Sequence, residues 1–299
     1  ADTRYNRKVA FVSATLFAVM PLSGLLRGIF LDSIALPFIL LSILFAIYYA
    51  KSSSRVDDET PHANREVIKL RFILLLSSGI FLGLAIFTKL PTFPLIPLMI
   101  FILLNKNISN SNSKKSSKWN KPNIKALGLW FIPVLLIPMI WPGYAISMGE
   151  FGNWVDGVIY QTARDNGGKD LRSSFVLVFG LDPILLTLAA AATIWAVIKR
   201  DYLILLWTLP YIVFLYLIGW AVPIHWSILV PVLCISSAVL IDNLINAAVS
   251  RKLAIARYYP HVIISAVIII GLVSTTLLIE SNLNSLYFQL YFFLAQELQ

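Results

Sequence analysis

Four ionisable side chains stand beside long apolar segments of this 299-residue sequence: Arg27 and Asp32 in LLRGIFLDSIALPF, Lys89 in GLAIFTKLP, and His225 in WAVPIHWSILVP. Arginine and lysine can hold a phosphate, and a carboxylate beside them can position or deprotonate a hydroxyl or help to hold a divalent cation. Each residue also has a simpler interpretation. The cations can extend to lipid headgroups, Asp32 can cap the helix that starts at Ser33, and His225 can be a satisfied interfacial residue.

The segments between these residues are apolar enough to cross a membrane. Hydrophobic residues make up 58% of the sequence and charged residues only 13%, with a mean hydropathy of +0.79. The short segment beginning LPTFPLIP contains prolines that predict a broken or kinked helix, and the run AAAAT at 189–193 predicts a helix–helix contact. We expect an all-α, polytopic bundle of about nine spans, near residues 9–26, 33–50, 72–88, 92–104, 126–146, 177–198, 202–220, 226–246 and 261–279.

Lysine and arginine are unevenly divided between the two sets of connecting segments. One set holds 19 of them, in residues 1–8, 51–71, 105–125, 199–201 and 247–260. The other set holds five, which are Arg27, Lys89, Arg164, Lys169 and Arg172. The positive-inside rule therefore predicts an integral protein of the cell membrane with a cytoplasmic N-terminus and the four ionisable residues at the outer ends of their spans. This topology accounts for the net charge of +9, so we expect no nucleic-acid partner.

Two outer segments have the composition of interfacial helices. The longest outer connection carries apolar residues at helical spacing, which predicts an amphipathic helix over residues 151–165 that lies along the outer interface. Residues 281–299 are rich in Leu, Phe and Tyr. They predict either a second outer-face amphipathic helix or the beginning of a further region. We therefore divide the chain into a transmembrane domain, residues 1–280, and a tail, residues 281–299.

Three segments, taken in order, resemble those of membrane glycosyltransferases of the GT-C superfold. The similarity is to the dolichyl-phosphate-mannose protein mannosyltransferase and aminoarabinose transferase group. RGIFLDSIALPFILLSIL resembles an Arg…Leu-Asp-x-x-x-x-F-F segment, and GLAIFTKLPTFPLIPLMI resembles a Gly-Leu-Ala-x-x-Thr-Lys…Pro segment. HWSILVPVLCISSAVLI resembles a His-x-x-Tyr-x-x-Pro segment, although Ser227 and Ile228 stand near the position where an aromatic residue is common.

The resemblance implies an inverting transferase that moves a sugar from a polyprenyl- or dolichyl-phosphate donor to a protein or lipid acceptor outside the cytoplasm. It implies that Arg27 and Lys89 bind the donor phosphate, that Asp32 is catalytic, and that His225 and Arg164 line the cavity. The group's first span and first outer loop, which carries the usual catalytic base, would precede residue 1. We therefore expect this sequence to be an N-terminally truncated fragment that is inactive alone.

A second class of protein fits the same composition, namely a non-enzymatic transporter or lipid-linked-sugar flippase. An outer-facing lateral cavity lined by Arg27, Asp32 and Lys89 would favour the transferase, whereas a central cavity closed off from them would favour transport. A structural membrane subunit is a third alternative, for which the outer charges should scatter. No cofactor is expected with certainty: Asp32 alone is no metal site, and the need for a divalent cation stays open.

Overall fold

The computed structural model of the chain describes residues 2, 4–27, 30–53, 63–105, 124–162, 170–250 and 259–280. Over these ranges the chain is helical and contains no strand, which confirms the all-α class. The helices, with 3₁₀ segments labelled η, are α1 Arg7–Val19, η1 Pro21–Arg27, α2 Leu31–Ser53, α3 Ala63–Thr88, η3 Leu90–Leu95, α4 Ile96–Leu104, α5 Ile124–Leu136, α6 Ile140–Ser147, α7 Phe151–Thr162, α8 Leu171–Leu181, α9 Pro183–Lys199, α10 Tyr202–Ile218, η4 Pro223–Ile228, α11 Val230–Ser250 and α12 Tyr259–Glu280.

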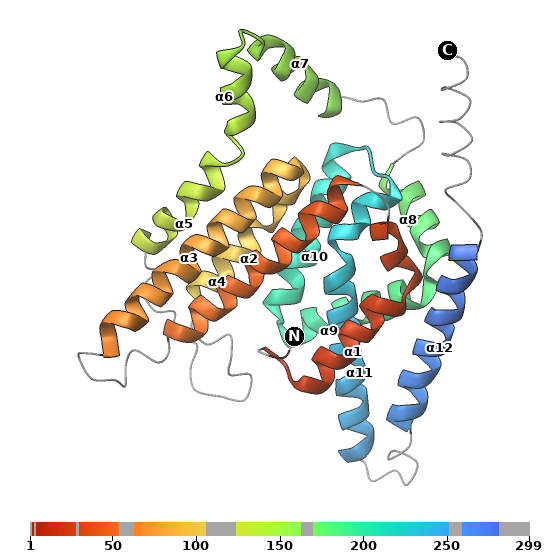
Figure 1. The fold of residues 1–299 in the computed structure, drawn as a ribbon. Helices are drawn as coiled ribbons and strands as arrows, with labels where there is room; N and C mark the ends of the chain where they lie inside the picture. Colours follow the sequence, from red (N-terminus) through yellow and green to blue (C-terminus); the bar gives the residue numbers. More distant parts are fainter. Residues whose placement is uncertain are drawn as a thin grey trace, which may run out of the picture.

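The helices form two packed groups that meet through α4, α10 and the 3₁₀ segments (Figure 1). In one group α2 packs against α3, and α3 packs against α5. In the other, α11 packs against α1 and α9, while α12 lies beside α1. Helix η4 contacts α2, η1 and α8, so it joins the start of α2 to the second group. Helices α6 and α7 extend away from the rest of the bundle (Figure 1).

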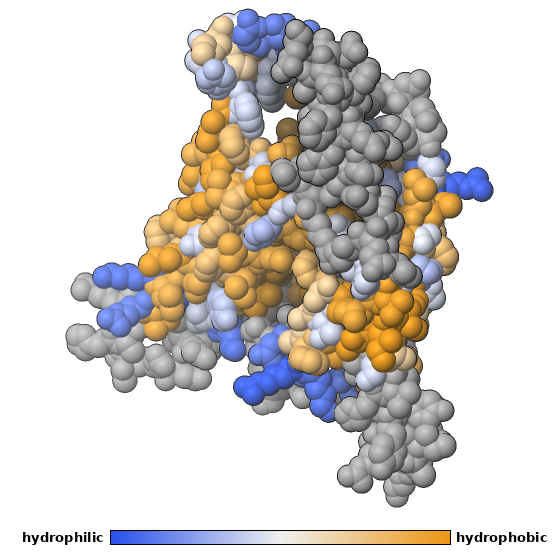
Figure 2. All heavy atoms as spheres, turned by 45° about the vertical axis from the view of Figure 1, so that its right-hand side comes forward, coloured by the Kyte–Doolittle hydropathy of each residue, from blue (hydrophilic) through white to orange (hydrophobic). Residues whose placement is uncertain are grey.

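The composition of the helices confirms an integral membrane protein. Three helices are long and apolar enough to cross a membrane, namely Leu31–Ser52, Glu66–Thr88 and Val230–Ala247, and two bent pairs raise the number to five among the residues described. Shorter apolar helices cover Leu90–Leu104 and Tyr202–Ile218, so the count of nine spans stays a prediction. Figure 2 shows a broad apolar band across the molecule, with hydrophilic residues gathered above and below it.

Three of the predicted spans are not single straight helices. The segment 177–198 is divided between α8 and α9, which meet at an angle of 117° at Asp182, because Pro183 begins α9 and Asp182 caps it. The segment 126–146 bends by 45° between α5 and α6, where Pro138 interrupts the helix. The segment 9–26 ends its α-helix at Val19, just before Pro21, and continues as η1.

Close packing of α3 on α5 depends on glycine. A Cβ atom added at Gly79 would lie 2.6 Å from the carbonyl oxygen of Trp130, and one at Gly83 would lie 2.6 Å from that of Pro133. Neither backbone oxygen can move aside as a flexible side chain could. Small residues at these positions therefore allow the two helices to approach, as is typical of helix contacts in membranes.

The predicted outer helix over residues 151–165 is confirmed as a helix, α7, which ends at Thr162. Within the described chain α7 makes its main contact with α6, and the side chains of Phe151, Ile159 and Tyr160 are exposed. Its position along a membrane surface stays a prediction. The predicted tail, residues 281–299, lies outside the described residues.

Candidate active site at the end of the bundle

The centre of the site is an ion pair between Asp32 and Lys89, which lie 57 residues apart in the sequence. Asp32 stands in the first turn of α2. Lys89 follows α3 directly, and Pro91 in η3 prevents that helix from continuing. The Lys89 Nζ donates to Asp32 Oδ2. The two side chains are only 11% and 4% exposed, so the pair is largely shielded from the surroundings.

The second oxygen of Asp32 is held by Ser227. The Ser227 hydroxyl donates a hydrogen bond of 3.0 Å to Asp32 Oδ1, and Ser227 is fully buried in η4. The carboxylate therefore has one partner for each oxygen, and the two partners come from different parts of the fold. Burial of a charged group is tolerated only with such partners.

Helix η4 is held in place from two other helices. The Trp207 Nε1 of α10 donates to the Ile228 carbonyl over 3.3 Å, and the Tyr211 hydroxyl donates to the His225 carbonyl over 2.9 Å. On the other side, the Trp226 Nε1 donates to the Ser174 hydroxyl of α8 over 2.9 Å. These bonds fix the backbone from which Ser227 reaches Asp32.

His225 lies in the same η4 segment, in the connection before α11. Its ring packs edge-on against Trp220, with ring centroids 5.2 Å apart, and its Nδ1 is buried with no hydrogen-bond partner in the part of the chain that the structure describes. Burial lowers the pKa of His225 to about 4, and the nearby Lys89 charge acts in the same direction, while Asp32 opposes it. The imidazole is therefore neutral at pH 7.

Lys89 lies in the connection between α3 and η3. Burial lowers the pKa of Lys89 below its usual value, and the Asp32 carboxylate opposes that shift. The ammonium and the carboxylate neutralise each other's charge. An approaching anion must therefore share Lys89 with Asp32 or take its place.

The structure brings together some of the residues expected at the site but not all. Asp32 and Lys89 are in direct contact, and His225 belongs to the segment that supplies Ser227. Arg27 ends η1, but its side chain is not described, and Arg164 lies outside the described residues. In the described ranges no three His, Cys, Asp or Glu residues converge to hold a metal ion. A cation at Asp32 would therefore need further ligands from substrate or water.

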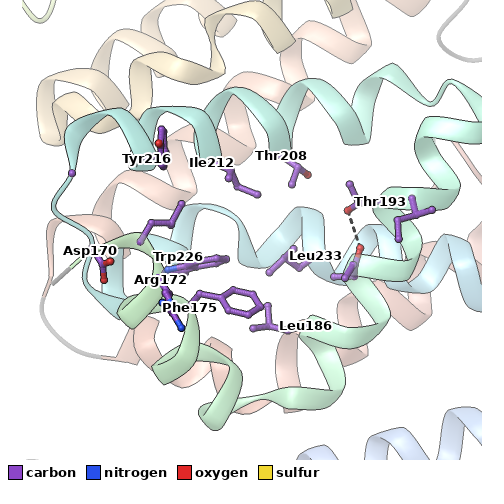
Figure 3. Close-up of a pocket in the computed structure, with 15 residues that line it drawn as sticks. Asp170, Arg172, Phe175, Leu186, Thr193, Thr208, Ile212, Tyr216, Trp226 and Leu233 are labelled. Carbon is purple, nitrogen blue, oxygen red and sulfur yellow. Dashed lines mark hydrogen bonds between the residues drawn. The ribbon is translucent and has the colours of Figure 1, made fainter. Parts of the chain in front are cut away.

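An apolar cavity of about 860 Å³ adjoins η4 at Trp226 and lies between α8, α9, α10 and α11 (Figure 3). Trp226, Phe175, Leu186 and Leu233 form much of its wall, whereas Asp170 and Arg172 lie at one end. Its lining includes neither Asp32 nor Lys89. It is thus not the lateral cavity expected from the sequence. The cavity and the ion pair are connected through η4, because Trp226 lines the cavity and the next residue, Ser227, donates to Asp32.

Sequence reasoning did not identify Ser227 as a partner of Asp32. In the sequence Ser227 stands out only because it lies near a position where an aromatic residue is common. Its place two residues after His225, in the third resembling segment, is the feature that could have indicated a role at the site. The alanine run lies in α9, which packs against α11 as expected, and Ala189 and Ala192 are buried. Ala189, Ala190 and Thr193 also line the cavity.

The fold and the site together define an integral, all-helical membrane protein with a shielded Asp–Lys pair at the end of its bundle. Residues 2–146, a little under half of the chain, match the family model described as dolichyl-phosphate-mannose-protein mannosyltransferase. This match confirms the resemblance to the GT-C mannosyltransferase group and indicates a membrane glycosyltransferase of the dolichyl-phosphate-sugar class. None of the curated proteins or solved structures compared with the chain matches it.

Proposed function

We propose that the protein transfers a sugar from a dolichyl- or polyprenyl-phosphate donor to a protein or lipid acceptor on the non-cytoplasmic face of the membrane, with inversion at the anomeric carbon. The observation that carries this proposal is the contact between Asp32 and Lys89, because both residues fall inside the segment that matches the mannosyltransferase family. The excess of Lys and Arg in the other set of connecting segments supports the outer face.

In this reaction the bond between the sugar C1 and the phosphate oxygen breaks, a bond from C1 to the acceptor oxygen forms, and the acceptor hydroxyl gives its proton to a carboxylate base. Negative charge develops on the departing lipid phosphate. Lys89 and Arg27 stabilise that charge, as cations at the headgroup level can do. As the resemblance implies, Asp32 would be the catalytic carboxylate, and His225 and Arg164, of which Arg164 lies outside the described residues, would line the reaction site.

Lys89 is available to a phosphate only through a change of partners. In the structure its ammonium donates to Asp32, and the side chain is 11% exposed. A donor phosphate that approaches Lys89 is stabilised by the ammonium and repelled by the carboxylate. The intact donor is a phosphodiester with one negative charge, the same as the carboxylate, and the charge rises as the sugar leaves and a phosphate monoester remains. The ammonium therefore stabilises the departing phosphate more strongly than the intact donor.

The apolar cavity supplies a place for part of the lipid chain of the donor. Most of its lining is apolar, including Phe175, Leu186, Ile212 and Leu233, which suits an isoprenoid. The hydroxyl-bearing residues of the lining are Thr193, Thr208 and Tyr216. Arg172, one of the five outer cations, lies at the end of the cavity that also contains Asp170 (Figure 3). We place the chain there because the cavity adjoins η4, which also contacts the ion pair through Ser227.

A transporter or flippase is the alternative. The full-length protein in nanodiscs, supplied with mannose-labelled dolichyl phosphate and a Ser/Thr-containing acceptor peptide, distinguishes the two. A transferase yields labelled peptide, and the anomeric configuration of the product, read by NMR, is opposite to that of the donor. Movement of labelled lipid between leaflets of vesicles without any labelled acceptor would favour the flippase and contradict the proposal.

A further inference from the structure

We propose that Ser227 is a positioning residue for this transfer, which holds the Asp32 carboxylate in one orientation while Lys89 engages its other oxygen. The inference rests on the proposed function and concerns how its site is kept in order. Ser227 Oγ lies 3.0 Å from Asp32 Oδ1, while Lys89 Nζ donates to Oδ2. A carboxylate with a different partner on each oxygen cannot rotate without losing one of its hydrogen bonds.

The position of the Ser227 hydroxyl is itself well determined. Ser227 is fully buried, and its neighbours in η4 are bonded to α8 and α10 through Trp226 and through the carbonyls of His225 and Ile228. Asp32 and Ser227 are 195 residues apart, so their contact depends on the packing of η4 against the start of α2. The hydrogen bond therefore joins two parts of the fold at the reacting end of the bundle.

This arrangement matters when a phosphate engages Lys89. The carboxylate then loses some or all of its hydrogen bond to the ammonium and is repelled by the incoming charge. Ser227 continues to hold Oδ1, so Asp32 stays in its place during the reaction. Loss of Ser227 should therefore slow turnover, since small misplacement of a reacting group is costly, while donor affinity is set mainly by Lys89 and the lipid chain.

The first test uses Ser227→Ala and Ser227→Thr in the full-length protein, with Ser237→Ala as the matched control. Ser237 is also fully buried, in α11, but its hydroxyl has no hydrogen-bond partner among the described residues. We expect Ser227→Ala to lower kcat by about 10- to 100-fold with the donor KM changed less than about twofold. Recovery of kcat in Ser227→Thr, which keeps a hydroxyl, supports the proposal. A kcat for Ser227→Ala equal to that of Ser237→Ala would overturn it.

A second test does not depend on sugar transfer. The effect of Ser227→Ala on the thermal midpoint is measured in the wild-type protein and in the Asp32→Ala/Lys89→Met double variant. The double variant lacks the ion pair and leaves neither charge unpaired. We expect the variant to lower the thermal midpoint by about 3 °C in the normal protein and to leave it unchanged or raised in the neutral background. Equal shifts in both backgrounds would overturn the contact. If the normal protein transfers no sugar, the proposed function fails, and this comparison still decides whether Ser227 holds Asp32.

Discussion

Two aspartates are buried in the described part of this membrane protein, and the fold accommodates them in different ways. Asp32 is 3% exposed and has side-chain partners, the Lys89 ammonium and the Ser227 hydroxyl. Asp182 is 2% exposed, and its partners are backbone amides: the Leu185 N–H at 3.0 Å and the Leu22 N–H at 3.2 Å. Each carboxylate is satisfied at both oxygens, but only Asp32 is paired with a cation.

The difference separates a chemical role from a structural one. The partners of Asp182 belong to the first turn of α9 and to η1, so this carboxylate fixes the 117° bend between α8 and α9. A substrate cannot replace a backbone amide without unfolding the helix end. The partners of Asp32 are side chains, which can exchange one ligand for another. This contrast supports the proposal that the chemistry lies at Asp32, whereas Asp182 holds the bend between α8 and α9.

The largest expected effect is the loss of sugar transfer when Asp32 is changed. We predict that Asp32→Asn lowers kcat/KM by about 1,000-fold, because the neutral amide cannot serve as the site's carboxylate. Asp182→Asn should stay within about fivefold of the normal enzyme, since the amide oxygen can still cap α9. Labelled transfer to an acceptor peptide measures both variants, at matched amounts of membrane-inserted protein. Similar losses in the two variants would break the distinction between the sites.

Substitution of Asp182 should lower the stability of the protein more than its activity. Asp182→Ala removes the cap of α9 and leaves the Leu185 and Leu22 amides without a partner, which should cost about 2 kcal/mol of unfolding free energy. Asp182→Asn should recover part of that cost, because its amide oxygen can still cap α9 while its NH2 group cannot accept from the Leu22 N–H. Denaturation of the purified protein in detergent measures the difference. Equal destabilisation by Ala and Asn would mean that the cap of α9 alone does not support the bend, and that the Leu22 contact or the charge of Asp182 does.

A smaller effect, on the KM for the donor, is expected from filling the apolar cavity beside η4. Ala190→Phe places a ring in the space lined by Leu186 and Ile194 and should raise the KM for a long-chain donor by about 10-fold. A donor with a single short isoprenoid unit should be much less affected. Val197→Phe, on the exposed side of the same helix and outside the cavity lining, is the control. An equal effect on short and long donors would place the lipid chain elsewhere.

Much of the membrane character was predictable from the sequence, because long apolar runs and the distribution of Lys and Arg are local properties. The meeting of Asp32 with Lys89 also agrees with the expectation that charges at one end of the spans converge. The Ser227 contact could not be predicted, because it depends on how η4 packs against α2 across 195 residues. The bend at Asp182 was missed although Pro183 signalled it, since the apolar residues on both sides resemble one continuous span.

The most direct test of the central claim is the affinity of the protein for dolichyl phosphate, the donor without its sugar. Binding to the full-length protein in nanodiscs is compared among the normal protein, Lys89→Met and Asp182→Asn. If Lys89 receives the lipid phosphate, Lys89→Met should bind at least about 10-fold more weakly, because it removes the cation and leaves Asp32 to repel the ligand. Asp182→Asn should bind normally. Equal affinity for all three proteins would contradict a phosphate site at the Asp32–Lys89 pair.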